Sequence, residues 1–316
     1  MASSMMAWRV HEFGAPEVMK LERVPQPEPG AGEILVKVAA AGVGPWDAWI
    51  RAGKSALPQP LPLTPGSDLS GSVVAVGPGE SNLSVGDAIY GVTNPQFTGA
   101  YAQFALANTA MVARKPASLA FVEAASVPVV AVTAWQALFD HAQLQSGQTV
   151  VIQGAAGNVG AFAVQFATRA GLRVVATASA DDAGFVRGLG ADTVIDFKTE
   201  HFEQVVQNAD AVIDLVGGDT QTRSFQVLRR GGKLISAVSH PDPNLARSRG
   251  VDATFFLVKV TTQGLADVAA LFDAGKLKTH IGSVLPLAQA PEAHLMLEGL
   301  VPRPKGKIVL VPFDTD

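Results

Sequence analysis

A block of 112 residues without proline, residues 129–240, is the feature that most limits how this chain can fold. Thirteen of the 20 prolines precede the block and seven follow it. Proline lacks the backbone donor that helix interiors and central strands need, so regular elements are easiest to build inside the block. The proline distribution therefore divides the chain into three parts.

Inside this block, short apolar runs rich in β-branched residues alternate with stretches of helical spacing. The runs cover residues 150–153, 173–177, 193–197, 211–216 and 233–238, with residues 253–258 as a candidate sixth. Continuous apolar strands separated by helices are typical of a parallel sheet covered on both faces. The pattern predicts an α/β fold with a doubly wound, six-stranded Rossmann sheet.

The flanking parts have a different pattern. Short apolar runs at residues 33–43, 70–79, 86–92 and 100–107 are each bounded by Gly, Pro, Asn or Asp. Short strands separated by such turn residues indicate a small antiparallel or barrel-like domain.

A glycine loop follows the first strand of the central block. Gly154, Gly157 and Gly160 occur at three-residue spacing and lead into a predicted helix with one apolar face. Small residues let the backbone approach a pyrophosphate, and the helix N-terminus offers free N–H groups and a positive dipole end. The spacing is not the strict G-x-G-x-x-G fingerprint, because Ala155 and Ala156 fill two places. A tight turn that binds nothing is the alternative, but the surrounding βα units favour dinucleotide binding.

The end of the second strand bears on the choice between NAD and NADP. An acidic residue there would bind the ribose hydroxyls of NAD, but the strand ends at Thr177, Ala178 and Ser179. Ser179 could donate to a 2′-phosphate, which favours NADP(H). Asp181 and Asp182 follow at once, and their alternative role is to cap the next helix.

Composition excludes several classes of protein. The chain contains no cysteine, which removes disulfides, thiolate nucleophiles and cysteine-ligated metal sites. Its net charge of −4 argues against nucleic acid as a partner. We find neither an uncharged apolar run of membrane-spanning length nor a signal peptide, and we therefore expect a cytoplasmic protein.

Motifs along the whole chain resemble one family. AAAGVGPWDAWIRAGK, LTPGSDLSGSVVAVGPGESNLSVGDAIYG, EAASVPVVAVTAWQAL, GAAGNVG and GKIVLV occur in this order between Ala39 and Val311. Together they resemble the medium-chain dehydrogenase/reductase superfamily, and within it the zinc-independent quinone oxidoreductase (zeta-crystallin-like) and alkenal reductase branch.

The resemblance implies a split catalytic domain, barrel-like or GroES-like, formed by residues 1–121 and 259–316. It encloses a cofactor domain of residues 122–258, with an active-site cleft between the two. Family positions for cofactor contacts fall on Thr133, Ala156, Gly157, Asn158, Val159, Val216, Gly217, Val238, Ser239, Phe256, Leu257, Val258 and Lys307. Gly154, Gly160 and Ser179 join them from the arguments on the glycine loop and the second strand. Lys307 is either a phosphate contact or a solvated lysine.

Departures from the zinc enzymes of this superfamily bear on mechanism. Gly44 stands where they carry a catalytic cysteine, and Ser67 stands where they carry a histidine. Neither can ligate zinc, so we expect no metal. Trp46 and Trp49 are candidates for an apolar substrate pocket or for core packing, and Ser67 is a candidate donor to the substrate oxygen. Asp47 matches a position behind the metal, where structural orientation or proton relay are the two options.

The resemblance implies reduction of quinones, enals or enones by hydride transfer from NADPH, with the proton donor left open. Two alternatives stay open: an enoyl-thioester reductase of the same fold, and a non-catalytic NADPH-binding protein. Relatives commonly pair through the last strand of the cofactor domain, so we expect a homodimer through residues 253–258.

Overall fold

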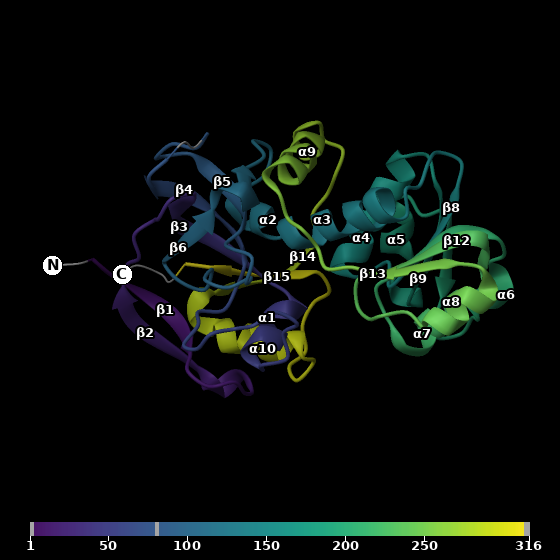
Figure 1. The fold of residues 1–316 in the computed structure, drawn as a ribbon, viewed down its shortest axis with the longest axis horizontal. Helices are drawn as coiled ribbons and strands as arrows, with labels where there is room; N and C mark the ends of the chain where they lie inside the picture. Colours follow the sequence, from purple (N-terminus) through teal and green to yellow (C-terminus); the bar gives the residue numbers. More distant parts are fainter. Residues whose placement is uncertain (1–2, 80–81, 313–316) are drawn as a thin grey trace. The chain divides into compact units, whose positions relative to one another are not determined.

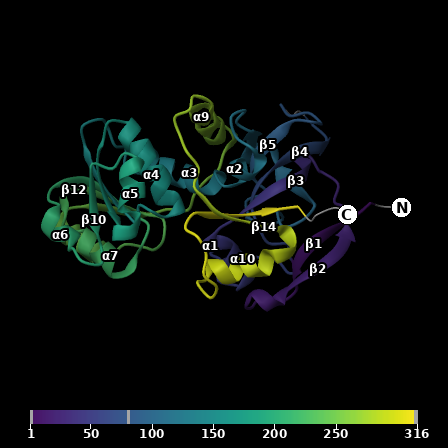
Figure 2. The same cartoon turned by 180° about the vertical axis from the view of Figure 1, so that it is seen from behind.

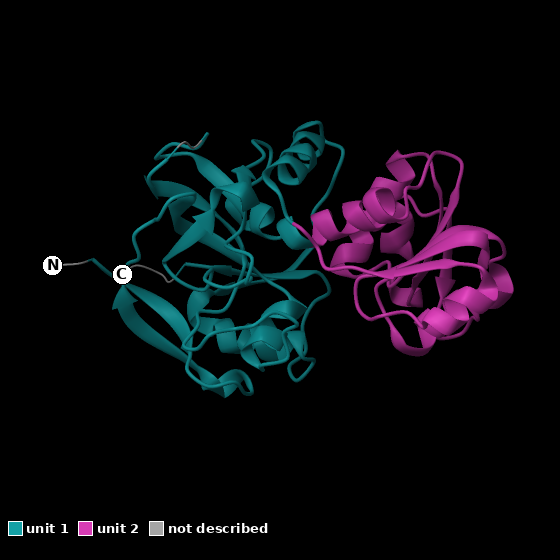
Figure 3. Ribbon diagram, in the orientation of Figure 1, with its two compact units in different colours: residues 1–129, 260–316 teal, residues 130–259 magenta. Residues whose placement is uncertain are grey.

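The computed structural model describes residues 3–79 and 82–312 of the chain. It contains two compact units (Figure 3). The first unit combines residues 1–129 with residues 260–316, and the second is residues 130–259. Each unit has its own sheet and its own apolar core.

The second unit contains a six-stranded parallel sheet. The strand order is β10-β9-β8-β11-β12-β13, so the chain starts in the middle of the sheet, builds one half and then the other. This order is the doubly wound arrangement that the alternating apolar runs predict. The strands are β8 (Thr149–Gln153), β9 (Arg173–Ala178), β10 (Thr193–Asp196), β11 (Ala209–Asp214), β12 (Leu228–Ser236) and β13 (Asp252–Phe255).

Helices cover both faces of this sheet, α4 and α5 on one side and α7 and α8 on the other (Figures 1 and 2). The apolar face of α4 is buried as its spacing predicts, and Gly171 beyond its end has a φ of +71°. The helical segments of the unit include α3 (Pro128–Trp135), which begins at the end of the first unit, and then η3 (Gln136–His141), α4 (Asn158–Arg169), η4 (Ala180–Asp182), α5 (Ala183–Gly188), α6 (Phe202–Val205), α7 (Gly218–Ser224) and α8 (Pro243–Arg249).

The first unit contains a seven-stranded sheet in which the C-terminal segment joins the N-terminal one. Strand β15 pairs antiparallel with β3, placing Ile308 opposite Val43. The sheet order is β14-β15-β3-β4-β5-β7, with β6 paired to β3, and β1 and β2 form a separate hairpin. The strands are β1 (Ser4–Val10), β2 (Met19–Pro25), β3 (Glu33–Val43), β4 (Asp68–Val76), β5 (Ala88–Val92), β6 (Phe104–Asn108), β7 (Val112–Arg114), β14 (Ile281–Pro286) and β15 (Lys307–Val311).

Helices of different lengths pack around the sheet of the first unit. Helix α1 directly follows β3 and carries both candidate pocket tryptophans. The core beneath it is built from alternating apolar residues of the strands, including Val36, Leu69 and Ile89. The helical segments are η1 (Pro16–Val18), α1 (Pro45–Arg51), η2 (Thr109–Met111), α2 (Phe121–Ala125), α9 (Thr262–Asp273), η5 (Leu287–Gln289) and α10 (Ala290–Leu297).

Candidate active site

The glycine loop joins β8 to α4 at the carboxyl edge of the parallel sheet. Gly154 turns the chain with a φ of +73°, and Gly157 directly precedes the first residue of α4. The first helical hydrogen bond runs from Ala161 N–H to Gly157 O, so the N–H groups of residues 158–160 have no acceptor within the helix. The helix start therefore leaves backbone donors free, the kind of group that binds anions.

The glycines of this loop serve different purposes. A Cβ at Gly160 would lie 2.3 Å from Gly154 O and 2.7 Å from Ala155 Cα, so this glycine permits close packing of the loop on the helix. A Cβ at Gly157 would meet only Gly154 O, at 3.2 Å. Gly157 has a φ of −72°, which any residue adopts, and it is exposed. The absence of a side chain at Gly157 keeps the mouth of the helix open, which fits a bound pyrophosphate.

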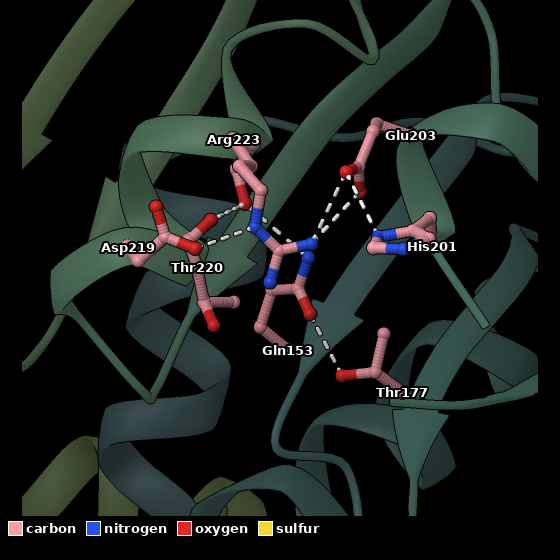
Figure 4. A network of polar contacts seen from close by, with 8 residues as sticks. Gln153, Thr177, His201, Glu203, Asp219, Thr220 and Arg223 are labelled. Carbon is pink, nitrogen blue, oxygen red and sulfur yellow. Dashed lines mark hydrogen bonds and ion pairs between the residues drawn. The ribbon is translucent and has the colours of Figure 1, made fainter. Parts of the chain in front are cut away.

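A chain of buried and partly buried hydrogen bonds holds the start of the loop, and Figure 4 shows Gln153, Thr177 and Thr220 within it. Gly154 N–H donates to Thr177 Oγ1 (3.2 Å), and the Thr177 hydroxyl donates to Gln153 Oε1 (2.7 Å). The Gln153 amide donates to Ser224 Oγ (3.2 Å), whose hydroxyl donates to Thr220 O (2.7 Å). These four hydrogen bonds connect the loop, β9 and α7 to one another.

The outer side of α7 is held by ion pairs in the same view (Figure 4). Arg223 contacts Glu203 at 2.9 Å and Asp219 at 2.8 Å, and Glu203 also faces His201 at 3.5 Å. Asp219 and His201 are largely exposed, so these pairs position α6 and α7 rather than add much stability.

Asp214, at the end of β11, organises the two loops that follow β11 and β12. One of its oxygens accepts the N–H groups of Val216 (3.1 Å) and Gly217 (2.8 Å). The other accepts from Gln221 Nε2 (2.8 Å) and Ser236 Oγ (2.9 Å). The Asp214 side chain is fully buried, and these four donors satisfy it there.

The predicted contact residues of these two loops lie next to one another. Gly217 has a φ of +78°, and a Cβ there would lie 3.2 Å from Ser239 Oγ and 3.3 Å from a methyl carbon of Val238. The side chains of Val216 and Val238 are 53% and 39% exposed. Two exposed valines at the carboxyl edge of a parallel sheet form an uncovered apolar surface, which suits the flat rings of a dinucleotide.

The end of β9 differs from the expectation in one detail. Ser179 is buried, and its hydroxyl donates to Asp182 Oδ2 at 2.7 Å. Asp182 directly precedes α5 but makes no side-chain cap bond to it. The hydroxyl of Ser179 is thus already bonded to a carboxylate three residues away.

The remaining predicted contacts of the second unit have varied surroundings. Thr133 lies within α3 and is buried, as is Phe256, whose ring centroid lies 4.3 Å from that of His141. Leu257 is 58% exposed. Two hydrogen bonds between Gln136 and Lys259 anchor residues 256–258 from the other end.

In the first unit, the two tryptophans of α1 differ in exposure. Trp49 is 50% exposed, so it is not a core residue. Trp46 is half-buried, and its indole Nε1 donates to Ser67 Oγ at 2.8 Å. Ser67 is fully buried beneath it, which leaves its hydroxyl without direct access from the surface.

Asp47 supports the start of α1. Its Oδ2 accepts the Gly44 N–H (2.8 Å) and the Tyr101 hydroxyl (3.3 Å), while its buried Oδ1 has no partner. Desolvation by burial raises the pKa of Asp47 to about 8, against the lowering effect of the Gly44 hydrogen bond. Of the two options for Asp47, these contacts favour structural orientation.

Lys307 is buried, contrary to its interpretation as a solvated lysine. Its Nζ lies 2.9 Å from Asp68 Oδ2 and 4.7 Å from the centroid of the Trp46 ring. The side chain is 2% exposed and fully engaged within the first unit. The solvated interpretation is therefore wrong, and a phosphate contact by Lys307 stays a prediction that this pairing does not favour.

Sequence reasoning missed the polar networks around α7 and a second buried cluster. Arg51, 2% exposed, reaches His294 Nδ1 (3.3 Å) and Glu298 (2.5 Å). Desolvation, and then the Arg51 charge, lower the pKa of His294 to about 3. A polar residue at the end of an apolar strand is the sequence signal that could have identified Gln153 and Asp214. No sequence signal points to Arg51 and His294.

The comparisons with known proteins cover most of the chain. Residues 30–117 match the alcohol dehydrogenase GroES-like domain, residues 189–310 a zinc-binding dehydrogenase domain, and residues 118–227 the glutamate/leucine/phenylalanine/valine dehydrogenases. Human quinone oxidoreductase is 32% identical over 308 residues, covering 92% of this chain and 93% of its own. This chain belongs to the medium-chain dehydrogenase/reductase superfamily.

Another relative is an NADPH-dependent alkenal/one oxidoreductase, chloroplastic, from Arabidopsis thaliana, 30% identical and covering 98% of this chain and 80% of its own. Three solved structures have the same fold. A quinone oxidoreductase from Coxiella burnetii is 32% identical (TM-score 0.90), covering 98% of this chain and 99% of its own. Mycobacterial Rv1454c complexed with NADPH is also 32% identical (TM-score 0.86), covering 98% and 100%. A cobalt- and zinc-bound alcohol dehydrogenase from Pyrobaculum aerophilum is 28% identical (TM-score 0.86), again covering 98% and 100%.

The zinc that some superfamily members bind does not fit the residues found here. The positions that the resemblance assigns to its ligands hold Gly44, which has no side chain, and Ser67, whose hydroxyl is bonded to Trp46. Across residues 3–79 and 82–312 there is no cluster of three His, Cys, Asp or Glu side chains able to hold a metal ion. Within the same residues, no helix is both long and apolar enough to span a membrane.

Proposed function

We propose that this chain is an NADPH-dependent, zinc-independent reductase of quinones or of activated carbon–carbon double bonds. The observation that carries the proposal is the carboxyl edge of the six-stranded sheet. An open helix N-terminus, two exposed valines and two loops fixed by Asp214 lie together there. The relatives named for quinone and for NADPH-dependent alkenal/one reduction support the same activity.

When bound, NADPH supplies the hydride, and the protein supplies binding and alignment. The N–H groups of residues 158–160 and the positive end of α4 would hold the pyrophosphate. Val216 and Val238 would pack against the rings of the cofactor, and the Asp214 and Gln153 networks keep the loops from rearranging. Loops already ordered before binding cost less conformational entropy when the cofactor arrives.

In the first unit, we propose that Trp46 and Trp49 contact the substrate. Residues three apart on a helix lie on the same side of it, so both indoles are presented together from α1. Flat aromatic surfaces favour planar conjugated substrates. Ser67, buried behind the indole, is placed to support Trp46 rather than to touch the substrate.

We also propose that two copies pair through β13. This strand has β12 on one edge and, within the described chain, no strand on its other edge. A free edge with apolar residues is a hazard unless it pairs, and a two-fold contact there would extend the sheet across two subunits.

The activity is tested by following NADPH absorbance with a panel of acceptors: 1,2-naphthoquinone, 9,10-phenanthrenequinone, an enal, an enone and crotonyl-CoA. We expect turnover of a quinone or of an enal or enone. Turnover of crotonyl-CoA alone would support the enoyl-thioester alternative. No turnover with tight NADPH binding would support a non-catalytic role.

A further inference from the structure

The Trp46 indole lies against the two residues that match metal ligands in the zinc enzymes. A Cβ at Gly44 would lie 2.3 Å from two carbons of the indole and 2.5 Å from a third, so the ring occupies the space of a side chain at position 44. Its Nε1 reaches Ser67 Oγ at 2.8 Å. The ring therefore fills the space between residues 44 and 67.

A buried charge fixes the ring from another direction. The Lys307 ammonium lies 4.7 Å from the ring centroid and 2.9 Å from Asp68 Oδ2. Asp68, the residue after Ser67, also accepts the Val129 N–H at 3.2 Å. A cation near an aromatic ring and an acceptor for its N–H together restrict the ring to one orientation.

We infer that Trp46 replaces the metal ion and acts as the specificity-determining residue of this enzyme. Where side chains at positions 44 and 67 would converge on a metal, a locked indole now stands over a lysine–aspartate pair. Residue 44 is glycine because the ring needs its space. The fixed indole favours binding of planar, conjugated substrates, since its own side chain loses no rotamer entropy when a flat ring stacks on it.

The inference about substrates rests on the proposed function. The steric coupling of residue 44 with the Trp46 ring, which we call the interlock, does not. Gly44→Ala should lower the melting temperature by several degrees, because the added methyl meets the indole. In a Trp46→Ala background the same substitution should cost almost nothing, since the obstructing ring is gone. A double-mutant cycle on melting temperature measures this coupling.

Gly71→Ala is the matched control. A Cβ there would lie 2.2 Å from the backbone oxygen of Lys37 and 2.8 Å from a methyl carbon of Val36, and Trp46→Ala leaves both in place. This substitution should destabilise both backgrounds equally. Equal cost of Gly44→Ala with and without the indole, or full tolerance of Gly44→Ala beside Trp46, would overturn the interlock.

Specificity is tested on the same variants. Trp46→Ala should lower the ratio of kcat/KM for 9,10-phenanthrenequinone to kcat/KM for a small enal by about tenfold, the order of one lost aromatic contact. The NADPH dissociation constant should change little, because Trp46 is not among the predicted cofactor contacts. A uniform loss on both substrates would show a merely structural role. No turnover by the unsubstituted protein would refute the proposed function and leave the stability cycle to decide the interlock.

Discussion

The hydrogen bond of the Ser179 hydroxyl affects how the end of β9 can bind a cofactor. It donates to Asp182, so a 2′-phosphate must compete with a carboxylate already in place. We still expect NADPH to bind more tightly than NADH, because no acidic residue ends the strand. Ser179→Asp should weaken NADPH binding at least tenfold by charge repulsion and leave NADH nearly unaffected. Fluorescence titration of both cofactors measures this, and tighter NADH binding by the unsubstituted protein would contradict it.

Asp47 should make stability depend on pH. Burial raises its folded pKa to about 8, above the ordinary value of 3.8, so the folded state keeps a proton that the unfolded state releases. Its contribution to stability is therefore present at pH 4 and is lost as pH rises to 8, by up to about 1.4 kcal/mol per pH unit. Asp47→Asn, which cannot ionise, should remove this slope.

Urea unfolding of both proteins from pH 4 to 8 provides the measurement. The difference in the free energy of unfolding between the two proteins isolates Asp47 from other groups, including His294, which titrates in the opposite sense. Parallel pH profiles for the two proteins would contradict the assignment.

At this scale the sequence shows which residues are unusual but not which residues they contact. Lys307 and Trp46 are 261 positions apart, and only β15 pairing with β3 brings them together. The pairing of Asp214 with Gln221 depends on a loop after β11, whose geometry depends on the positive φ of Gly217. No local pattern encodes such contacts.

Among the elements, the central block was predictable because its physics is local. Apolar β-branched runs separated by amphipathic stretches specify strands and helices, and the parallel sheet follows from their alternation. The predicted runs at 33–43 and 86–92 of the first unit lie on β3 and β5, since turn residues bound them. The apolar run at residues 253–258 looks like one strand in the sequence, but only its first part is a strand. Strand β13 ends at Phe255, and the buried ring of Phe256 packs against His141.

Strand β13 carries the prediction of a dimer. Phe256 N–H donates to Ser236 O, so by alternation the N–H of Ala253 points to the free edge. Ala253→Pro should remove this donor and shift the protein from dimer to monomer at micromolar concentration. Light scattering measures the mass, with circular dichroism as the check on folding. A monomer before substitution refutes the pairing.

For the whole molecule, the proposed activity requires no metal. Elemental analysis of the purified protein should find no stoichiometric zinc, and EDTA should leave NADPH oxidation unchanged, because an indole fills the matching site. Activity that is lost to EDTA and restored by zinc would show that Gly44 and Ser67 had been misread as replaced ligands.

The central claim is that the glycine loop binds the cofactor pyrophosphate. Substitutions at Gly157 and Gly160 distinguish an effect on cofactor binding from an effect on folding. Gly157→Val should raise the NADPH dissociation constant at least a hundredfold and barely change the melting temperature of the apo protein, since residue 157 is exposed and its φ is unstrained. Gly160→Val should instead unfold the loop, because its Cβ has only 2.3 Å to Gly154 O. The deciding measurement is NADPH titration of Gly157→Val beside its melting curve. Weakened binding with an intact fold is the predicted result, and normal NADPH binding by the folded variant would contradict it.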